Sequence, residues 1–279
     1  MRGSGILATV GHVSAIAGAA TVGPLLRDWR LRRRLSQLDL ALEAGVSSRH
    51  LSFVETGRAR PSAAMVLKLA EQLDVPLRDR NRMLLAAGHA PRFHQRALDE
   101  PEMAPAREAI RLLLEGHEPY PAVVVDRAWE QLAGNAAVGL LIERVAPHLL
   151  EPPVNVLRVS LHPDGLAPQI VNLGEWRAHL LSRLRRQIAL TGDPALATLL
   201  EEVRAYPGPD AVDGHDAGPL GEIAVALRLR TSAGELALIS TVATFGTAVE
   251  ITASELSIES FFPADEPTAA ALRAHSRRR

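Results

Sequence analysis

Residues 37–55 constrain the fold more strongly than any other part of the chain. Two short amphipathic helical segments, QLDLALEAG and SSRHLSFVE, lie on either side of a turn that contains Gly45. Glycine adopts the left-handed or tight backbone that such a turn requires. Ala41 lies where the two helices touch, so its small side chain allows close approach, while Val46 and Leu51 point into the core. The segment predicts two closely packed helices, the second of which exposes a polar face.

Helical patterns also fill the rest of residues 24–88, and five can be distinguished. Pro24 suits a first helical position, because its missing N–H would have no helical partner there. Ser36 followed by Asp39 is a variant of the capping box, in which side chains and backbone N–H groups bond reciprocally. The fifth pattern stops at Gly88. We therefore expect an all-α domain of five helices over residues 24–88, after a flexible leader at residues 1–23.

Charge is distributed unevenly along the chain. Residues 24–96 hold fourteen Lys/Arg against seven Asp/Glu, whereas residues 97–279 hold sixteen against twenty-five. A basic front and an acidic back indicate that only the front meets a polyanion such as DNA. Chance variation in surface charge is the alternative interpretation of the charge pattern taken by itself.

The segment LSQLDLALEAGVSSRHLSFVETGRARPS resembles the helix-turn-helix of the XRE family, the relatives of the lambda-type phage repressors. The match is carried by Leu35-Ser36-Gln37, Leu40-Ala41, Ala44-Gly45-Val46-Ser47, Leu51-Ser52, Glu55, Gly57 and Pro61-Ser62. The resemblance implies a lambda-repressor-like DNA-binding domain whose second motif helix enters the major groove by its N-terminal end. It also implies an internal ion pair between Arg30 and Glu55, which makes Glu55 structural.

The candidate DNA contacts combine this resemblance with side-chain chemistry. The resemblance implies that Gln37 binds backbone phosphate, that residues of the second motif helix reach bases or phosphates, and that two later arginines lie near the backbone. Arg49 can donate two hydrogen bonds to guanine or contact a phosphate, and both options stay open. Taken alone, these polar residues would form an ordinary solvated face. The set is Gln37, Ser47, Ser48, Arg49, His50, Ser52, Arg58 and Arg60.

The second half of the chain mixes helical and strand patterns. Residues 89–105 show no apolar periodicity and are expected to form a linker. Two short strands around a turn, PAVVVD and WEQLAGN, are followed by helical segments, of which EWRAHLLSRLRRQIAL is strongly amphipathic. Towards the end the period changes to two in EIAVALRLR, ELALISTVATFG and LSIESFF, with TSAG as a hairpin turn between the first two. Strands at both ends with helices between them predict an α+β domain.

This second half resembles the ligand-binding domain of the MmyB-like transcription regulators. The resemblance is carried by EPPVNVLRVSLHPDGLAPQIVNLGEWRAHLLSRLRRQ, TGDPAL, LLEEVRAYPG and TVATFGTAVEITASELSIESFFPAD, while EPYPAVVVDRAWEQLAGNAAVGLL resembles the start of a PAS-like domain. It implies a PAS-like fold over residues 106–266 and a regulator that senses a small apolar molecule. A C-terminal tail is expected at residues 267–279.

The pocket of this second domain is poorly defined by sequence. Trp129, Trp176 and Phe245 are large apolar side chains near expected strand or helix faces and are candidates for ligand contact, although ordinary core positions would look the same. His162 and Asp164 in SLHPDG raise the question of a metal, but a metal site needs further ligands at set spacing. We expect a structural turn there, an exposed loop at DGHD (213–216), and neither metal nor cofactor.

Several functional classes are disfavoured by what the sequence lacks. It has no cysteine, which excludes disulfides and thiolate sites and fits a reducing compartment. It has no run of eighteen apolar residues, so no membrane span is expected. No Ser/His/Asp order, P-loop or dinucleotide fingerprint supports an enzyme with a DNA-binding tether.

The sequence thus predicts a cytoplasmic, nucleoid-associated transcription regulator that is not an enzyme. It is expected to bind a double-stranded DNA operator as a homodimer and to be modulated by a small apolar ligand in its second domain. The alternative is a DNA-binding regulator whose second domain only dimerises and senses no ligand.

Overall fold

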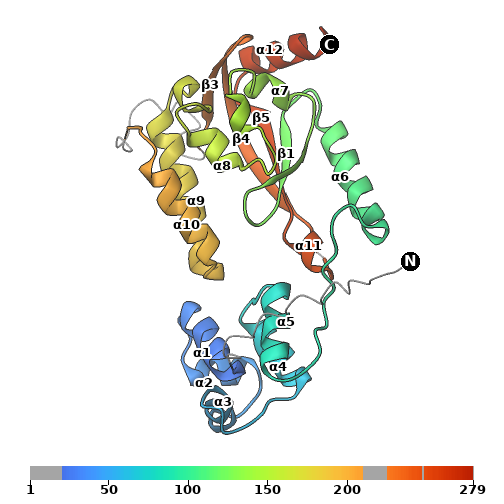
Figure 1. The fold of residues 1–279 in the computed structure, drawn as a ribbon, viewed down its shortest axis with the longest axis vertical. Coiled ribbons are helices and arrows are strands. Elements are labelled where there is room, and N and C mark those ends of the chain that lie inside the picture. Colours follow the sequence, from blue (N-terminus) through green and yellow to red (C-terminus); the bar gives the residue numbers. More distant parts are fainter. Residues whose placement is uncertain (1–20, 210–224, 247, 279) are drawn as a thin grey trace, which may run out of the picture. The chain divides into compact units, whose positions relative to one another are not determined.

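The computed structural model describes residues 21–209, 225–246 and 248–278. These residues divide into two compact units, with the boundary between Arg92 and Phe93 (Figure 1). The boundary lies inside the segment expected as a linker. Within the second unit, backbone hydrogen bonds tie the residues just after the boundary to residues 250–252: the N–H of Ile251 donates to the carbonyl of His94 over 2.8 Å.

The first unit is all-α, as the sequence predicts. Its helices are α1 (Val22–Arg32), α2 (Gln37–Glu43), α3 (Ser48–Glu55), α4 (Ala63–Gln72) and α5 (Leu77–Ala86). The expected capping box is present at the start of α2, where Ser36 Oγ accepts from the N–H of Asp39 and the Asp39 carboxylate accepts from the N–H of Ser36. The core is built from fully buried side chains of every helix, among them Leu26, Leu40, Leu51, Leu69 and Leu84.

The start of α1 corrects the expected leader boundary. The helix begins at Val22 and not at Pro24, and Val22 and Gly23 are both buried. A Cβ at Gly23 would lie 2.4 Å from the carbonyl oxygen of Glu55, so only glycine permits the close approach of α1 to the end of α3. Residues 1–20 of the expected leader lie outside the described residues.

The second unit is built on one antiparallel sheet with the strand order β2-β1-β5-β4-β3. The strands are β1 (Ala122–Val125), β2 (Gln131–Gly134), β3 (Leu227–Thr231), β4 (Gly234–Thr244) and β5 (Ser257–Pro263). Both expected hairpins form, and β5 lies between β1 and β4, so the two hairpins become a single sheet. Residues 222–224 of the expected EIAVALRLR strand lie outside the described residues.

The two faces of the sheet carry different apolar clusters. Val123 and Val125 of β1 point to the larger cluster, whereas Val124 points to a smaller one, as alternation along a strand requires. The larger cluster is covered by α7 (Val138–Leu141), α8 (Val156–Leu161), α9 (Leu173–Thr191) and α10 (Pro194–Ala205), and α9 and α10 run side by side (Figure 1). The smaller one is covered by α6 (Ala104–Gly116). The α+β fold class is confirmed.

Short helices complete the second unit. They are the 3₁₀ turns η1 (Pro101–Met103), η2 (Pro147–Leu149) and η3 (Ala167–Gln169), and α11 (Ile251–Ser254). The expected DGHD loop lies outside the described residues. Within the described ranges, no helix is long and apolar enough to cross a membrane.

The expected C-terminal tail is a packed helix, α12 (Glu266–Ser276). Asp265 caps it by accepting from the N–H of Thr268, and the Thr268 hydroxyl accepts from the N–H of Ala237 in β4. Leu272 is fully buried in the larger cluster. The prediction of a tail was wrong. This helix has few apolar residues, so its sequence gives little signal, and they are buried only because the helix packs against the sheet.

Candidate functional site

The N-terminal part of α3 presents a polar face. Ser47 caps the helix, its Oγ accepting from the N–H of His50. Ser48 and Arg49 are exposed, and His50 and Ser52 are half-buried. The guanidinium of Arg49 lies 5.4 Å from the centre of the Phe53 ring, which places it along the helix surface. These side chains lie where the sequence predicts, and their contact with DNA remains a prediction.

A buried ion pair holds α3 in place. Arg30 of α1 donates through Nε and Nη2 to the two carboxylate oxygens of Glu55, over 2.7 and 2.9 Å. Its third bond, from Nη1, goes to the carbonyl of Leu35. The pair that the XRE resemblance implies is therefore present in the bidentate form, which fixes the relative orientation of both groups.

Gln37 has a structural partner that the sequence did not indicate. Its side-chain Nε2 donates to Glu55 Oε2 over 2.7 Å. One carboxylate thus joins the first residue of α2 to the last residue of α3, across the turn that contains Gly45. Gln37 was expected only to bind phosphate, because the 18-residue separation from Glu55 carries no local signal.

The electrostatics of Glu55 follow from this cluster. Burial by itself would raise the pKa of Glu55, but the hydrogen bonds from Arg30 and Gln37 and the positive charge of Arg30 outweigh it. The pKa of Glu55 is consequently held below its usual value. The carboxylate stays ionised at neutral pH, which keeps the buried arginine paired.

The two arginines after α3 differ in their surroundings. Arg58 is exposed, in the turn that follows Gly57, whose backbone has a φ of +76°. Arg60 donates from Nε to the carbonyl of Ala87 over 3.0 Å, so it ties this turn to the end of α5. Arg60 therefore has a structural role, besides the DNA contact that the sequence predicts for it.

The second unit contains an apolar cavity of about 80 Å³, open on one side, between the sheet and α7, α8 and α9. Trp129 and Trp176 line it, as expected. Phe245 does not, because it packs on the opposite face of the sheet, against the smaller cluster that includes Leu114 and Ile258. Other lining side chains come from the sheet (Val123, Leu227, Phe261) and from the helices (Leu141, Leu157, Leu180).

Most polar groups around the cavity are paired. Trp176 Nε1 donates to Ser160 Oγ over 2.9 Å. Glu259 of β5 is buried and accepts from Arg183 Nη1 over 2.9 Å. Arg183 in turn lies 4.7 Å from the centre of the Trp129 ring. Glu259 is not among the residues that the sequence singles out, although a charged residue within the apolar strand LSIESFF is a signal of a special environment.

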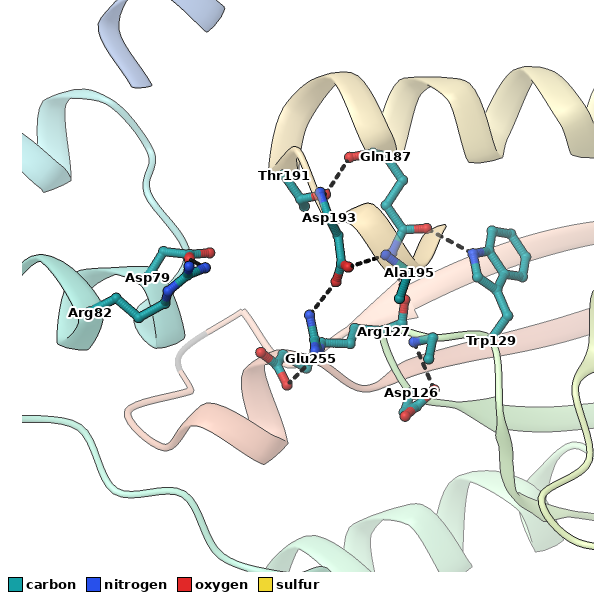
Figure 2. Close-up of polar contacts among 11 residues, drawn as sticks. Asp79, Arg82, Asp126, Arg127, Trp129, Gln187, Thr191, Asp193, Ala195 and Glu255 are labelled. Atoms are coloured by element: carbon teal, nitrogen blue, oxygen red, sulfur yellow. Dashed lines mark hydrogen bonds and ion pairs between the residues drawn. The ribbon is translucent and has the colours of Figure 1, made fainter. Parts of the chain in front are cut away.

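The turn that carries Trp129 is held from several directions (Figure 2). Trp129 has a backbone φ of +66°, which is rare for a large side chain. Its Nε1 donates to Gln187 of α9 over 2.8 Å, and Gln187 donates to the carbonyl of Arg127. Arg127 itself pairs with Asp193, the cap of α10, and lies 3.8 Å from Glu255 at the end of α11.

Comparison with known proteins assigns both units. Residues 106–274, more than half of the chain, match the model of the MmyB-like transcription regulator ligand binding domain. The chain belongs to this family. Residues 26–79 match a helix-turn-helix model, so this MmyB-like regulator carries its DNA-binding module ahead of the ligand-binding domain.

The chain also resembles a known helix-turn-helix transcriptional regulator. Over 72 residues, the regulator is 39% identical to the uncharacterized HTH-type transcriptional regulator RghRB of Bacillus subtilis (strain 168). The aligned region covers 25% of this chain and 50% of the relative, so the chain spans about half the length of the curated relative it matches.

The buried pair predicts a pH dependence of stability. Because the folded-state pKa of Glu55 is lowered, its contribution is complete above the unfolded-state pKa and is lost as pH falls below about 4.5. Glu55→Gln should lower the free energy of unfolding of the first unit by about 3 kcal/mol at pH 7, since it leaves Arg30 buried without its counter-charge. The measurement is urea unfolding at pH 7 and pH 4.

Glu43→Gln, on the exposed face of α2, is the matched control and should unfold like the wild type. The loss caused by Glu55→Gln should shrink at pH 4. An equal loss at both pH values would show that the carboxylate charge does not matter.

Proposed function

We propose that this MmyB-like regulator binds specific operator sequences in double-stranded DNA and that a small apolar ligand in its second unit modulates this binding. It acts in the cytoplasm, where the DNA lies, and performs no catalysis. The observation that carries the proposal is the exposed polar start of α3, held by the Arg30–Glu55 pair, in the same chain as a ligand-binding domain with an apolar cavity.

The DNA contact is proposed to be made by the N-terminal part of α3. At this end the helix offers the exposed side chains of Ser48 and Arg49. Arg49 is long enough to reach a base edge, and its stacking on Phe53 restricts the directions it can take. We assign it either the bidentate guanine contact or a phosphate contact, and these differ in their consequences.

The first test concerns Arg49. Arg49→Ala should cost about 1–3 kcal/mol at the operator and relax the preference at one base position if Arg49 reads guanine. Binding is measured by fluorescence anisotropy on operator and scrambled duplexes across a salt series. Arg144→Ala, an exposed arginine of the second unit, is the control.

Equal weakening on both duplexes, with a shallower salt dependence, would assign Arg49 to a phosphate. Unchanged binding on both would remove α3 from the interface.

We infer that a small apolar ligand occupies this cavity and enlarges it on binding. Its volume of about 80 Å³ is below the ~300–1,000 Å³ of typical ligand pockets. It is also smaller than the ~150 Å³ of an engineered cavity that binds benzene. Since Trp129 lies both on the cavity wall and on the turn between β1 and β2, outward movement of this turn is the simplest way to make room.

A contact path joins this turn to the segment that follows the first unit. Arg127, in the turn, lies beside Glu255 at the end of α11. At the start of α11, Glu250 accepts from the N–H of Arg96, and Thr252 donates to the carbonyl of Arg96. We infer that a ligand which displaces the turn also shifts this segment, and thereby changes DNA affinity.

Ligand binding is tested by thermal unfolding with straight-chain acyl compounds and other apolar metabolites. At a concentration about 100-fold above Kd, a ligand stabilises the folded state by about 2.7 kcal/mol. Each kcal/mol raises Tm by about 2–4 °C in a domain of this size. Ile142→Phe should reduce the shift because Ile142 lines the cavity, whereas Leu149→Phe, equally half-buried but outside the lining, should not.

The absence of any shift across the panel would favour the alternative, in which the second unit only dimerises. A shift that leaves operator binding unchanged would support ligand binding without regulation.

We further propose that the working unit is a homodimer formed through the second unit. One recognition helix reads few base pairs, and related repressors place two helices in successive major grooves about 34–36 Å apart. Two neighbouring leucines of α6, Leu112 and Leu113, are 56% and 50% exposed, whereas Ile110 and Leu114 of the same helix are buried against the sheet. A second copy is their proposed partner.

Sedimentation equilibrium tests this arrangement. The full chain should be a dimer, and Leu112→Glu with Leu113→Glu should make it monomeric and weaken operator binding at least tenfold. Val249→Glu, at a residue that is 81% exposed on a loop, should leave the dimer intact. A monomeric wild type with full operator affinity would refute the proposal.

A further inference from the structure

Three potential metal ligands converge on the surface of the second unit. The nitrogens of His148 and His162 and a carboxylate oxygen of Asp164 all lie within 4.8 Å of one another. Asp164 Oδ2 is 3.9 Å from His148 Nε2 and 3.8 Å from His162 Nδ1. The sequence showed only His162 and Asp164 together, and the fold supplies a third ligand from η2.

The backbone positions these residues by fixed contacts. The N–H of Ala146, just before η2, donates to the carbonyl of Asp164 over 2.9 Å and so joins the two loops. The turn after α8 is closed by a bond from the N–H of Gly165 to the carbonyl of His162. A Cβ at Gly165 would lie 2.2 Å from the carbonyl oxygen of Val159, so this close turn requires glycine.

The ring of His162 is also held by an aromatic neighbour. It packs edge-on against Tyr206, with ring centres 4.9 Å apart. The Tyr206 hydroxyl donates to Glu202, which accepts two bonds from Arg158 over 2.7 and 2.8 Å. Such supporting contacts orient a histidine before the ion arrives.

The donor set matches a first-row transition metal. Two imidazole nitrogens and one carboxylate oxygen suit Zn²⁺, which binds them at about 2.0–2.2 Å and takes water in an open fourth position. Exposed side chains can close the remaining gap by small rotations. His162 Nδ1 accepts from the N–H of Asp164 over 3.0 Å, so its lone pair is directed toward Asp164, and the ion replaces that bond.

We propose that His148, His162 and Asp164 bind a divalent transition-metal ion of the Zn²⁺ type. The ion cross-links η2 to the end of α8, whose Val159 and Ser160 line the apolar cavity. This site is separate from the proposed apolar ligand, and it does not depend on the proposed function.

The test uses the full chain, freed of metal, in competition with a chromophoric chelator for Zn²⁺. We expect one Zn²⁺ bound per chain through this site and no binding of Mg²⁺ or Ca²⁺, which prefer oxygen ligands. His148→Ala and Asp164→Asn should each lower Zn²⁺ affinity at least tenfold. Both side chains are more than half exposed, so neither change threatens folding.

His94→Ala, which removes an exposed histidine elsewhere, should leave the affinity unchanged. Substitution with Co²⁺ gives a second readout, because its visible absorption should change in the same two variants. Zn²⁺ bound with equal affinity by wild type, H148A and D164N would overturn the proposal, as would no binding below about 100 µM. Either result would leave the DNA and apolar-ligand experiments unaffected.

Discussion

The carboxylate of Glu55 is the point on which the first unit depends. This carboxylate of α3 accepts hydrogen bonds from Arg30 of α1 and Gln37 of α2. One side chain therefore orients three helices. A buried ion pair adds little net stability compared with apolar packing, but its bidentate geometry allows one arrangement only. The backbone beside it is equally restricted, because Gly23 lies against the Glu55 carbonyl with no room for a side chain. The exposed start of α3 is therefore presented by a rigid support.

In the second unit, the strand β5 plays the corresponding part, because its pairing holds the two hairpins of the sheet together. This strand comes from the end of the chain and pairs with both β1 and β4, so the sheet cannot close until nearly the whole domain has been made. β5 also carries Glu259, and the alternation of the strand points this carboxylate into the larger cluster, where Arg183 pairs with it. Arg183 in turn covers Trp129. A charge network thus forms part of the cavity wall, and the cavity shape and the sheet register are set together.

Local signals predicted most of the elements but few of the contacts between them. The Ser36–Asp39 capping box and the TSAG hairpin turn were readable because their partners lie within a few residues. The placement of Phe245 on the opposite face, the packing of α12 and the approach of His148 to Asp164 were not readable, since each depends on residues distant in sequence. Gln37 shows the same limit within the first unit: its role towards DNA was implied by resemblance, whereas its bond to Glu55 required the folded helices.

The size of the cavity bears on how such a regulator responds. A preformed pocket of ligand size would bind without altering the protein, and a ligand that favours no conformation shifts no equilibrium. A cavity of about 80 Å³ is smaller than the ~300–1,000 Å³ of typical ligand pockets, which is the basis for the proposal that its wall moves when a ligand binds. Trp129 is the element best placed to move, because its left-handed backbone is costly for a large residue and is maintained by the bonds of Gln187 and Arg127 around it. In the proposed regulation, a ligand that binds only the opened cavity shifts the turn, α11 and the segment after Arg92 through its preference for the open state. The free energy of opening then lowers the apparent affinity for the ligand, because only the open fraction of molecules can bind it.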